Sequence, residues 1–103
     1  MNGYQFTDSE SIAWRNSKLA DRVHVKDLGS ANGRSMQLVR YDPGASFPLH
    51  THAGPVFIYL LEGEAFQQGQ RLLRGWAAVA ASGTVDDNFH SPGGCLFLTV
   101  YSE

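Results

Sequence analysis

Glycine and proline interrupt this chain at short intervals, and this spacing limits the secondary structure that can form between them. The 103 residues include 11 glycines and 4 prolines, and turn signals such as Asn32-Gly33 recur about every eight to twelve residues. The intervening segments, such as 35–41 and 95–101, are rich in β-branched and aromatic residues and are too short for most helices. We therefore predict an all-β chain that forms a small barrel or jelly roll.

Side-chain alternation indicates where the strands lie. Residues 21–28 alternate between apolar and polar, as does 35–41, so each is predicted to be a half-buried strand. Residues 56–61 are apolar throughout, which predicts a strand covered on both faces. Gly63 is expected to end that strand, and 84–90 is expected to form a single polar strand.

The first part of the chain lacks a clear strand pattern. We predict an N-terminal arm over 1–20 that belongs to the same domain as a barrel over 21–103. Residues 7–10 have the spacing of a helix capping box, so one or two helical turns could follow them. An irregular arm with Trp14 packed against the barrel is the alternative.

Composition and charge exclude several classes of partner. Apolar residues make up 43% and charged residues 17% of the chain, enough for a packed core. The net charge of -2 gives no reason to expect nucleic acid or an anionic membrane as partner. A single cysteine, Cys95, excludes an internal disulfide framework and favours a reducing compartment. No apolar run has the length of a membrane span and the N-terminus lacks a secretory pattern, so we expect a soluble cytoplasmic protein.

Two histidines one residue apart are the main chemical signal. Successive side chains of a strand point to opposite faces, so His50 and His52 are expected to share a face. Neutral imidazoles aimed into one space suit a divalent transition metal. Two polar side chains at an exposed strand entry are the simpler alternative.

The frame around this pair resembles the first motif of the cupin superfamily. That motif has a glycine, five residues, His-x-His and a later glycine, which here are Gly44, His50, His52 and Gly63. The chain is most similar to the ChrR-like group, which includes cupin domains of anti-sigma factors and dihydroxyacetophenone-type dioxygenases. The resemblance implies a single-domain jelly-roll barrel in which the two histidines hold a metal.

The second cupin motif is degraded, which changes the expected ligand set. Asp86 stands where the family has its third histidine, and His90 stands where it has an asparagine. The usual metal-binding glutamate would fall near Val56 or Phe57, neither of which can bind a metal. The resemblance therefore carries over only the two histidines of the first motif.

Chemistry favours Asp86 as the third ligand. Two histidines and a carboxylate form the facial triad typical of Fe(II), which leaves open positions for a substrate and dioxygen. Mn, Ni or Zn would fit the same donors. A solvated turn acid is the alternative, and one β-bulge would exchange Asp86 with Asp87. We predict a divalent metal, Fe(II) first, at His50, His52 and Asp86.

His90 follows Asp86 by four residues, so a continuous strand would place both on one face. It could then act as an acid or base beside the metal, whereas a histidine on the barrel rim is the alternative. The resemblance places Gln67 and Gln68 near positions where some cupins carry a carboxylate at the metal site, which implies that their amides could orient a metal ligand.

Apolar and aromatic side chains could line a pocket for an aromatic or apolar small molecule. The same side chains could equally be plain barrel filling. The candidates are Met36, Phe47, Phe57, Tyr59 and Trp76.

Three functions are compatible with this sequence. The first is a metal-dependent, dioxygenase-like enzyme acting on a small ketone or aromatic compound. The second is a non-catalytic module that senses a small ligand or a metal. The third is a decayed site retained as a scaffold. A homodimer formed through a sheet edge is expected, because exposed edge strands favour pairing.

Overall fold

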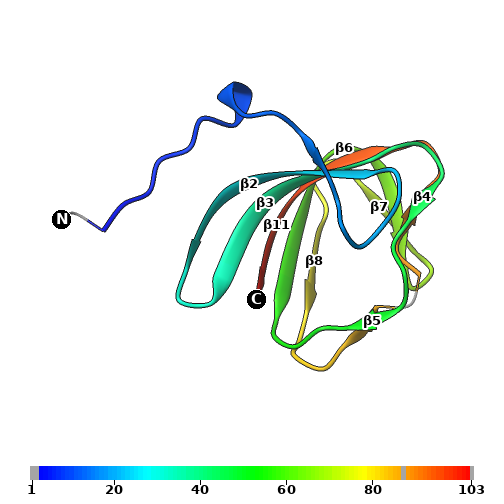
Figure 1. Ribbon diagram of the computed structural model, residues 1–103. Coiled ribbons are helices and arrows are strands. Elements are labelled where there is room, and N and C mark those ends of the chain that lie inside the picture. Colours follow the sequence, from blue (N-terminus) through cyan, green and yellow to red (C-terminus); the bar gives the residue numbers. More distant parts are fainter. Residues whose placement is uncertain (1–2, 87, 103) are drawn as a thin grey trace.

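One long strand, β6 (Val56–Gln67), belongs to both halves of the curled sheet (Figure 1). The computed structural model describes residues 3–86 and 88–102. The first half of β6 pairs with β11 (Cys95–Ser102) and β8 (Ala77–Ala80), whereas its second half pairs with β7 (Gln70–Leu73) and β10 (His90–Ser91). Because one strand serves both sets of partners, the sheet curls around an interior.

The main sheet has the strand order β1-β2-β3-β11-β6-β10-β4, with β7 and β8 also paired to β6. A separate ladder joins β5 to β9, and the described pairs are antiparallel. The bounds of these other strands are β1 Arg15–Asn16, β2 Val23–Ala31, β3 Arg34–Tyr41, β4 Ala45–Ser46, β5 His50–Thr51 and β9 Val85–Asp86. The predicted all-β, single-domain jelly roll is confirmed.

The β2–β3 hairpin forms where the sequence predicted it. Asn32 and Gly33 have φ values of 53° and 76°, and an Asn-Gly pair with two positive φ values is the preferred two-residue hairpin turn. This turn brings the alternating apolar residues of the two strands onto a common face, with Val25 opposite Val39.

Gly63 does not end a strand, contrary to the prediction. β6 continues through it, with φ of 79°. A Cβ at this position would collide with the carbonyl oxygen of Gly94, so close approach of two backbones explains the glycine. The pairing of β6 with β11 shifts register between Leu96 and Phe97, close to this point. A bulge of this kind lets one strand bend from one wall into the next.

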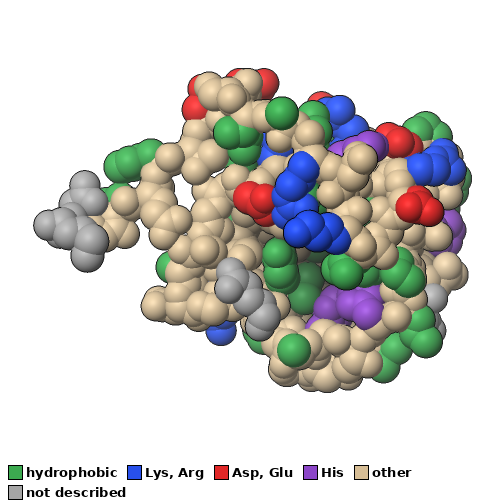
Figure 2. Space-filling model, viewed as in Figure 1, with side chains coloured by type: hydrophobic (Ala, Val, Ile, Leu, Met, Phe, Trp, Pro, Cys, Tyr) green, Lys and Arg blue, Asp and Glu red, His purple; other side chains and the backbone are tan. Residues whose placement is uncertain are grey.

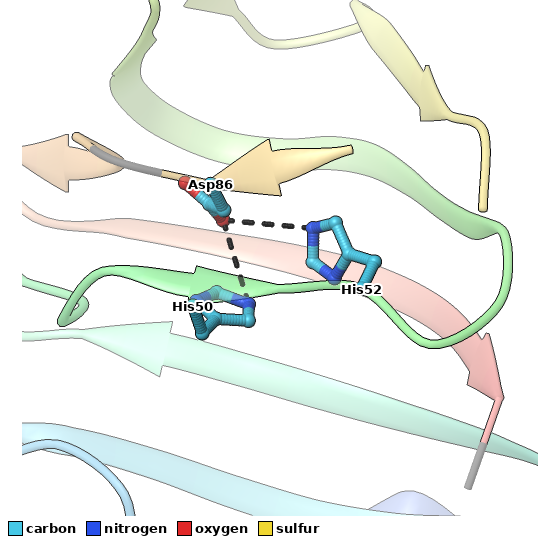
Figure 3. Close-up of side chains that lie close together, drawn as sticks. All are labelled: His50, His52 and Asp86. Carbon is cyan, nitrogen blue, oxygen red and sulfur yellow. Dashed lines mark ion pairs between the residues drawn. The ribbon is translucent and has the colours of Figure 1, made fainter. Parts of the chain in front are cut away.

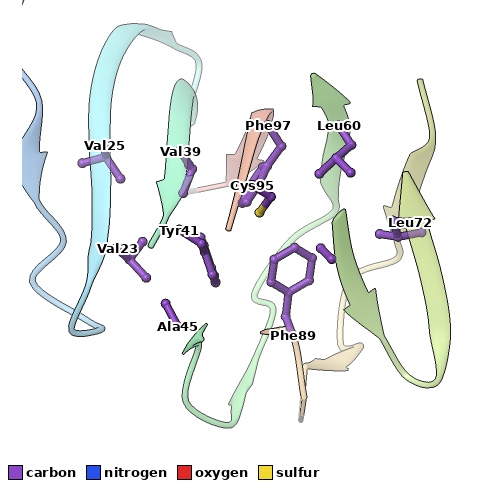
Figure 4. Packing of buried hydrophobic residues seen from close by; sticks show 11 residues of the cluster. Val23, Val25, Val39, Tyr41, Ala45, Leu60, Leu72, Phe89, Cys95 and Phe97 are labelled. Carbon is purple, nitrogen blue, oxygen red and sulfur yellow. The ribbon is translucent and has the colours of Figure 1, made fainter. Parts of the chain in front are cut away.

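The buried core lies against the inner face of the wall formed by β2, β3, β11 and β6 (Figure 4). The ring of Tyr41 meets Phe89 edge-on, with centroids 5.2 Å apart, and Phe97 completes the group. Leu60 of β6 is fully buried. These side chains alternate with outward-facing ones along each strand, as in a half-barrel whose inner face is apolar.

Two further predictions differ from the structure. The polar segment 84–90 is not one strand, because β9 pairs with β5 while β10 pairs with β4 and β6. In the N-terminal arm, Asp8 rather than Thr7 caps a single 3-10 turn, Ser9–Ser11. The arm then pairs with β2 through β1, and Arg40 stacks on Trp14, 4.4 Å from the ring centroid.

Across the described ranges 3–86 and 88–102, no helix has the length and apolar character needed to cross a membrane.

Candidate metal centre

The β5–β9 ladder brings together the two histidines and the aspartate singled out by the sequence. His50 lies directly opposite Asp86 in this ladder. The backbone of His52 continues it by donating to Thr84 and accepting from Gly83. The imidazole centroids are 4.6 Å apart. Two very short strands therefore set the spacing of three side chains.

The donor atoms converge on one point (Figure 3). Asp86 Oδ2 lies 3.8 Å from Nε2 of His50 and 3.8 Å from Nε2 of His52. One donor atom from each of the three side chains lies within 4.8 Å of the others. Donors bound to one ion at about 2.0–2.2 Å lie roughly 3–3.5 Å apart, so small rotations of these side chains would bring all three onto a shared ion.

Neighbouring groups orient two of the three donors. Nδ1 of His50 lies 2.9 Å from the carbonyl oxygen of Pro48, which can only accept, so this nitrogen carries the proton. The lone pair then resides on Nε2, which faces Asp86. The amide of Gln67 donates to Asp86 Oδ1 over 3.0 Å, which leaves Oδ2 directed at the imidazoles. Such contacts fix ligand tautomers and raise metal affinity.

Burial favours the neutral, metal-binding form of His52. Loss of solvent lowers the pKa of the His52 imidazole, the proximity of His50 lowers it further, and Asp86 opposes both effects. The ring is mostly shielded from solvent, with 14% of the side chain exposed. A metal ligand must be deprotonated, so a low pKa keeps His52 available at neutral pH.

These donors lie on the wall of an open cavity of about 1160 Å³ (Figure 2). Figure 2 shows histidine side chains beside hydrophobic ones where this face is hollowed. Apolar side chains such as Val39, Ile58 and Phe97 supply much of the lining, with polar groups from Gln37 and Thr99. A small, mostly apolar ligand with one or two polar atoms would fit such a lining.

Tyr41 adds a polar group to this cavity. Its side chain lines the space and is 4% exposed. Burial raises the pKa of its phenol, and the nearby Cys95 and Asp86 raise it further. The phenol therefore stays protonated, so it can donate a hydrogen bond to a ligand oxygen.

The predicted pocket residues separate into two groups. Phe47 lines the cavity, with its ring 4.7 Å from that of His50. The remaining four are 43–47% exposed and are not among the side chains that line the cavity. These four residues are Met36, Phe57, Tyr59 and Trp76. Met36, Phe57 and Tyr59 lie outside the cavity because successive side chains of a strand point to opposite faces. Their immediate neighbours point inward, so these three point outward.

His90 does not join the metal donors. It lies in β10, opposite Ser46 and Phe66, and its ring stacks on Phe66 at 5.3 Å. It is not among the residues that line the cavity. The break between β9 and β10 removes the continuous strand on which its predicted role depended. Asp87, the alternative to Asp86, lies outside the described residues.

Two polar lining residues were missed by the sequence reasoning. Gln37 and Thr99 are 8% and 6% exposed and lie directly opposite one another in β3 and β11. Each shares the parity of buried apolar residues in its own strand, namely Val39 and Phe97. A polar residue on a buried face was the available signal, because such groups need a partner or a ligand.

The donor chemistry fits a divalent transition ion. Two imidazoles and one carboxylate would hold such an ion and leave it free to bind a further ligand, as in the facial triad. Within the residues that the structure describes, these three side chains form a group able to hold a metal.

Comparison with known proteins agrees with this fold. The family model described as the ChrR Cupin-like domain matches residues 2–102. None of the curated proteins matches the chain.

Three solved structures illustrate the likeness. An acetylacetone dioxygenase from Acinetobacter johnsonii is 17% identical with a TM-score of 0.84, and the match covers 99% of this chain and 74% of that one. The polyketide cyclase RemF from Streptomyces resistomycificus is 20% identical with a TM-score of 0.82, over 96% and 79% of the two chains. The Rhodobacter sphaeroides SigE complex with the anti-sigma ChrR gives 20% identity and a TM-score of 0.76, over 90% and 50%. At these identities the likeness concerns the fold alone.

Proposed function

The chain belongs to the ChrR cupin-like domain family, and from this premise we propose that it is a metal-dependent, dioxygenase-like enzyme. The proposal assigns His50, His52 and Asp86 as ligands of one divalent ion, with Fe(II) as the preferred metal. The observation that carries it is the convergence of their three donor atoms within 4.8 Å at the wall of a cavity.

The donor set supports Fe(II) over the alternatives. Imidazole suits several divalent ions, but two histidines with one carboxylate and open positions are typical of Fe(II) oxygenases. Mn, Ni and Zn would bind the same donors with other geometries. When bound, such an ion supplies a Lewis acid and a site where a ketone and dioxygen meet.

The chain's own side chains would position the substrate. The apolar lining from Val39, Ile58 and Phe97 favours a small ketone or aromatic compound over a charged one and keeps water from its carbon skeleton. The Tyr41 phenol would hold its proton toward a carbonyl oxygen of that compound. Gln67 would keep Asp86 Oδ2 directed at the ion, because its amide occupies the other carboxylate oxygen.

Metal binding is tested by calorimetric titration of the metal-free protein with Fe(II) under argon, and with Mn(II), Ni(II) and Zn(II) in air. We expect one ion per chain and an affinity loss of about 100-fold or more in His50→Ala, because one of three protein donors is removed. His24→Ala is the matched control, since His24 contacts Asn16 and Asp42 outside the site. Equal binding by both variants would contradict the assignment.

Activity is tested separately by oxygen consumption of the Fe(II)-loaded protein with a panel of β-diketones and hydroxyacetophenones. Turnover that disappears in Asp86→Asn supports the enzyme. Tight metal and ligand binding with no oxygen uptake across the panel contradicts it.

A non-catalytic sensor is the second candidate. It is favoured by the departure from the family's ligand set, because Asp86 replaces a histidine and Val56 or Phe57 stands where a glutamate ligand is expected. One solved relative is itself an anti-sigma protein in complex with its sigma factor. For a sensor, ligand or metal binding should change affinity for a protein partner, and oxygen consumption should be absent.

A further inference from the structure

The outer face of the main wall is apolar, which sets it apart from other exposed parts of the sheet. On β3, β11 and β6, the residues that alternate with the cavity-lining ones point away from the interior. This outer face is defined by Met36, Leu38, Leu96, Leu98, Val100, Phe57 and Tyr59. Val79 of β8 lies beside it, opposite Phe57, and also borders the cavity. An antiparallel sheet that meets water normally carries polar residues on that side.

The sequence of β6 predicts a strand covered on both faces, but one face of β6 is exposed in a single copy of the chain. This difference indicates that another molecule covers that face. Residues 56–61 are apolar on both parities, the pattern of a strand covered on both faces. In one copy of the chain, however, Phe57 and Tyr59 remain 43% and 47% exposed, and Val79 is 67% exposed. The second cover is therefore not supplied by the described residues of the chain itself.

We propose that this outer face is the contact surface of a homodimer, in which the same face of a second copy covers it. This inference does not depend on the proposed metal chemistry. It replaces the sheet edge expected from the sequence with a sheet face as the place of contact.

The available area is sufficient for such a contact. At about 200 Å² for a whole aromatic side chain, the exposed parts of this face amount to roughly 500–600 Å² per copy. Two copies would then bury about 1,000–1,200 Å² in total, at the lower end of specific interfaces. We therefore expect a reversible dimer whose dissociation is measurable.

The charges around the face fit a second copy better than an acidic or basic partner. Leu96 lies opposite Arg40 on one side and opposite Glu62 on the other. A twofold axis along β11 exchanges the two sides, so Glu62 of one copy would face Arg40 of the other, whose guanidinium also stacks on Trp14 of its own arm. Along the same wall, Phe57 would face Met36 and Tyr59 would face Leu38, which keeps apolar groups together.

The test is sedimentation equilibrium from about 1 µM to 1 mM, the range in which contacts of this size dissociate. We expect a dimer of the wild-type chain whose dissociation constant rises about 100-fold or more in Phe57→Glu, since a carboxylate would be buried at the contact. Phe6→Glu is the matched control, because Phe6 is 83% exposed in the arm, and it should remain dimeric. Circular dichroism confirms that each variant is folded.

A second pair of variants tests the arrangement without altering the apolar face. Glu62→Arg should weaken the dimer about fivefold, because the twofold axis repeats each unfavourable charge contact. Adding Arg40→Glu should restore it.

Several outcomes would overturn the proposal. They are a wild-type monomer throughout the range, a dimer that persists in Phe57→Glu, a dimer that Phe6→Glu dissociates, and a dissociation constant unchanged by Glu62→Arg. A monomer that co-sediments with phosphatidylcholine vesicles would make the face a lipid-binding surface instead.

Discussion

The wall and the rim of the barrel are built in contrasting ways. The wall consists of β2, β3, β11 and the first half of β6, paired over long registers of up to eight residues. The rim consists of β5 and β9, two strands of two residues each, which carry His50 and Asp86. The wall buries the core, whereas the rim leaves its polar side chains half-buried. The contrast suggests that stability resides in the wall and metal affinity in the rim.

A substitution in the wall should therefore have the largest effect on stability. Phe97→Ala removes a buried ring that packs on Tyr41 and Phe89, and we expect it to cost about 3–5 kcal/mol of unfolding free energy. Phe57→Ala, on the outer side of the same wall, should cost under about 1.5 kcal/mol in the dissociated chain, at concentrations where no dimer forms. Urea unfolding of both variants measures the difference, and equal losses would break the comparison.

A substitution in the rim should show the reverse pattern. Asp86→Asn keeps the shape of the side chain but removes its charge, so the affinity for a divalent ion should fall about 100-fold, or about 2.7 kcal/mol. The unfolding free energy of the metal-free protein should change by less than about 1 kcal/mol, because the group is at the edge of the cavity. Calorimetry and urea unfolding of one preparation measure both quantities. A large loss of stability with unchanged affinity would contradict the division.

Gln67 connects the two regions, because it lies at the end of β6 and donates to Asp86. Gln67→Leu should lower metal affinity about 10-fold by freeing the carboxylate to rotate. Gln70→Leu, in β7 and bonded to the Arg71 carbonyl, is the control and should bind metal normally. If both variants bind equally, Gln67 has no role in orienting the ligand.

The smallest expected effect is on the pH dependence of stability without metal. Folding lowers the pKa of His52 from its ordinary value of 6.5, chiefly through burial. Below that value the unfolded chain takes up a proton that the folded protein resists, so stability should fall as pH drops from 7 toward 5. His52→Gln should flatten this decline in urea midpoints measured along the pH series. An unchanged slope would show that His52 does not titrate differently on folding.

Much of the wall could be predicted from the sequence because its signals are local. The Asn32-Gly33 turn and the alternation of 35–41 are properties of neighbouring residues. Alternation groups side chains by parity, but it does not say which parity faces inward. Both faces of β3 carry apolar residues, so the sequence alone favours Met36 for the pocket and gives no reason to choose Gln37, which lies on the inner face. The unusual outer face is thus also the reason for that error.

The rim was predicted less completely because its geometry depends on distant parts of the chain. The histidine pair was visible as a motif, and Asp86 followed from metal chemistry. The predicted place of His90 beside Asp86 requires one continuous strand, and nothing in 84–90 shows that the chain leaves one sheet and enters another. The sequence predicts a strand end at Gly63 because the contact that explains this glycine, with Gly94, is made across 31 positions of sequence.

The most direct test of the metal centre is anomalous diffraction from crystals grown with Mn(II) or Fe(II), recorded on both sides of the metal's absorption edge. The account predicts one peak per chain, about 2.0–2.3 Å from Nε2 of His50, Nε2 of His52 and Oδ2 of Asp86. A peak elsewhere, or an absence of any peak in crystals whose solution binds the metal stoichiometrically, would contradict it.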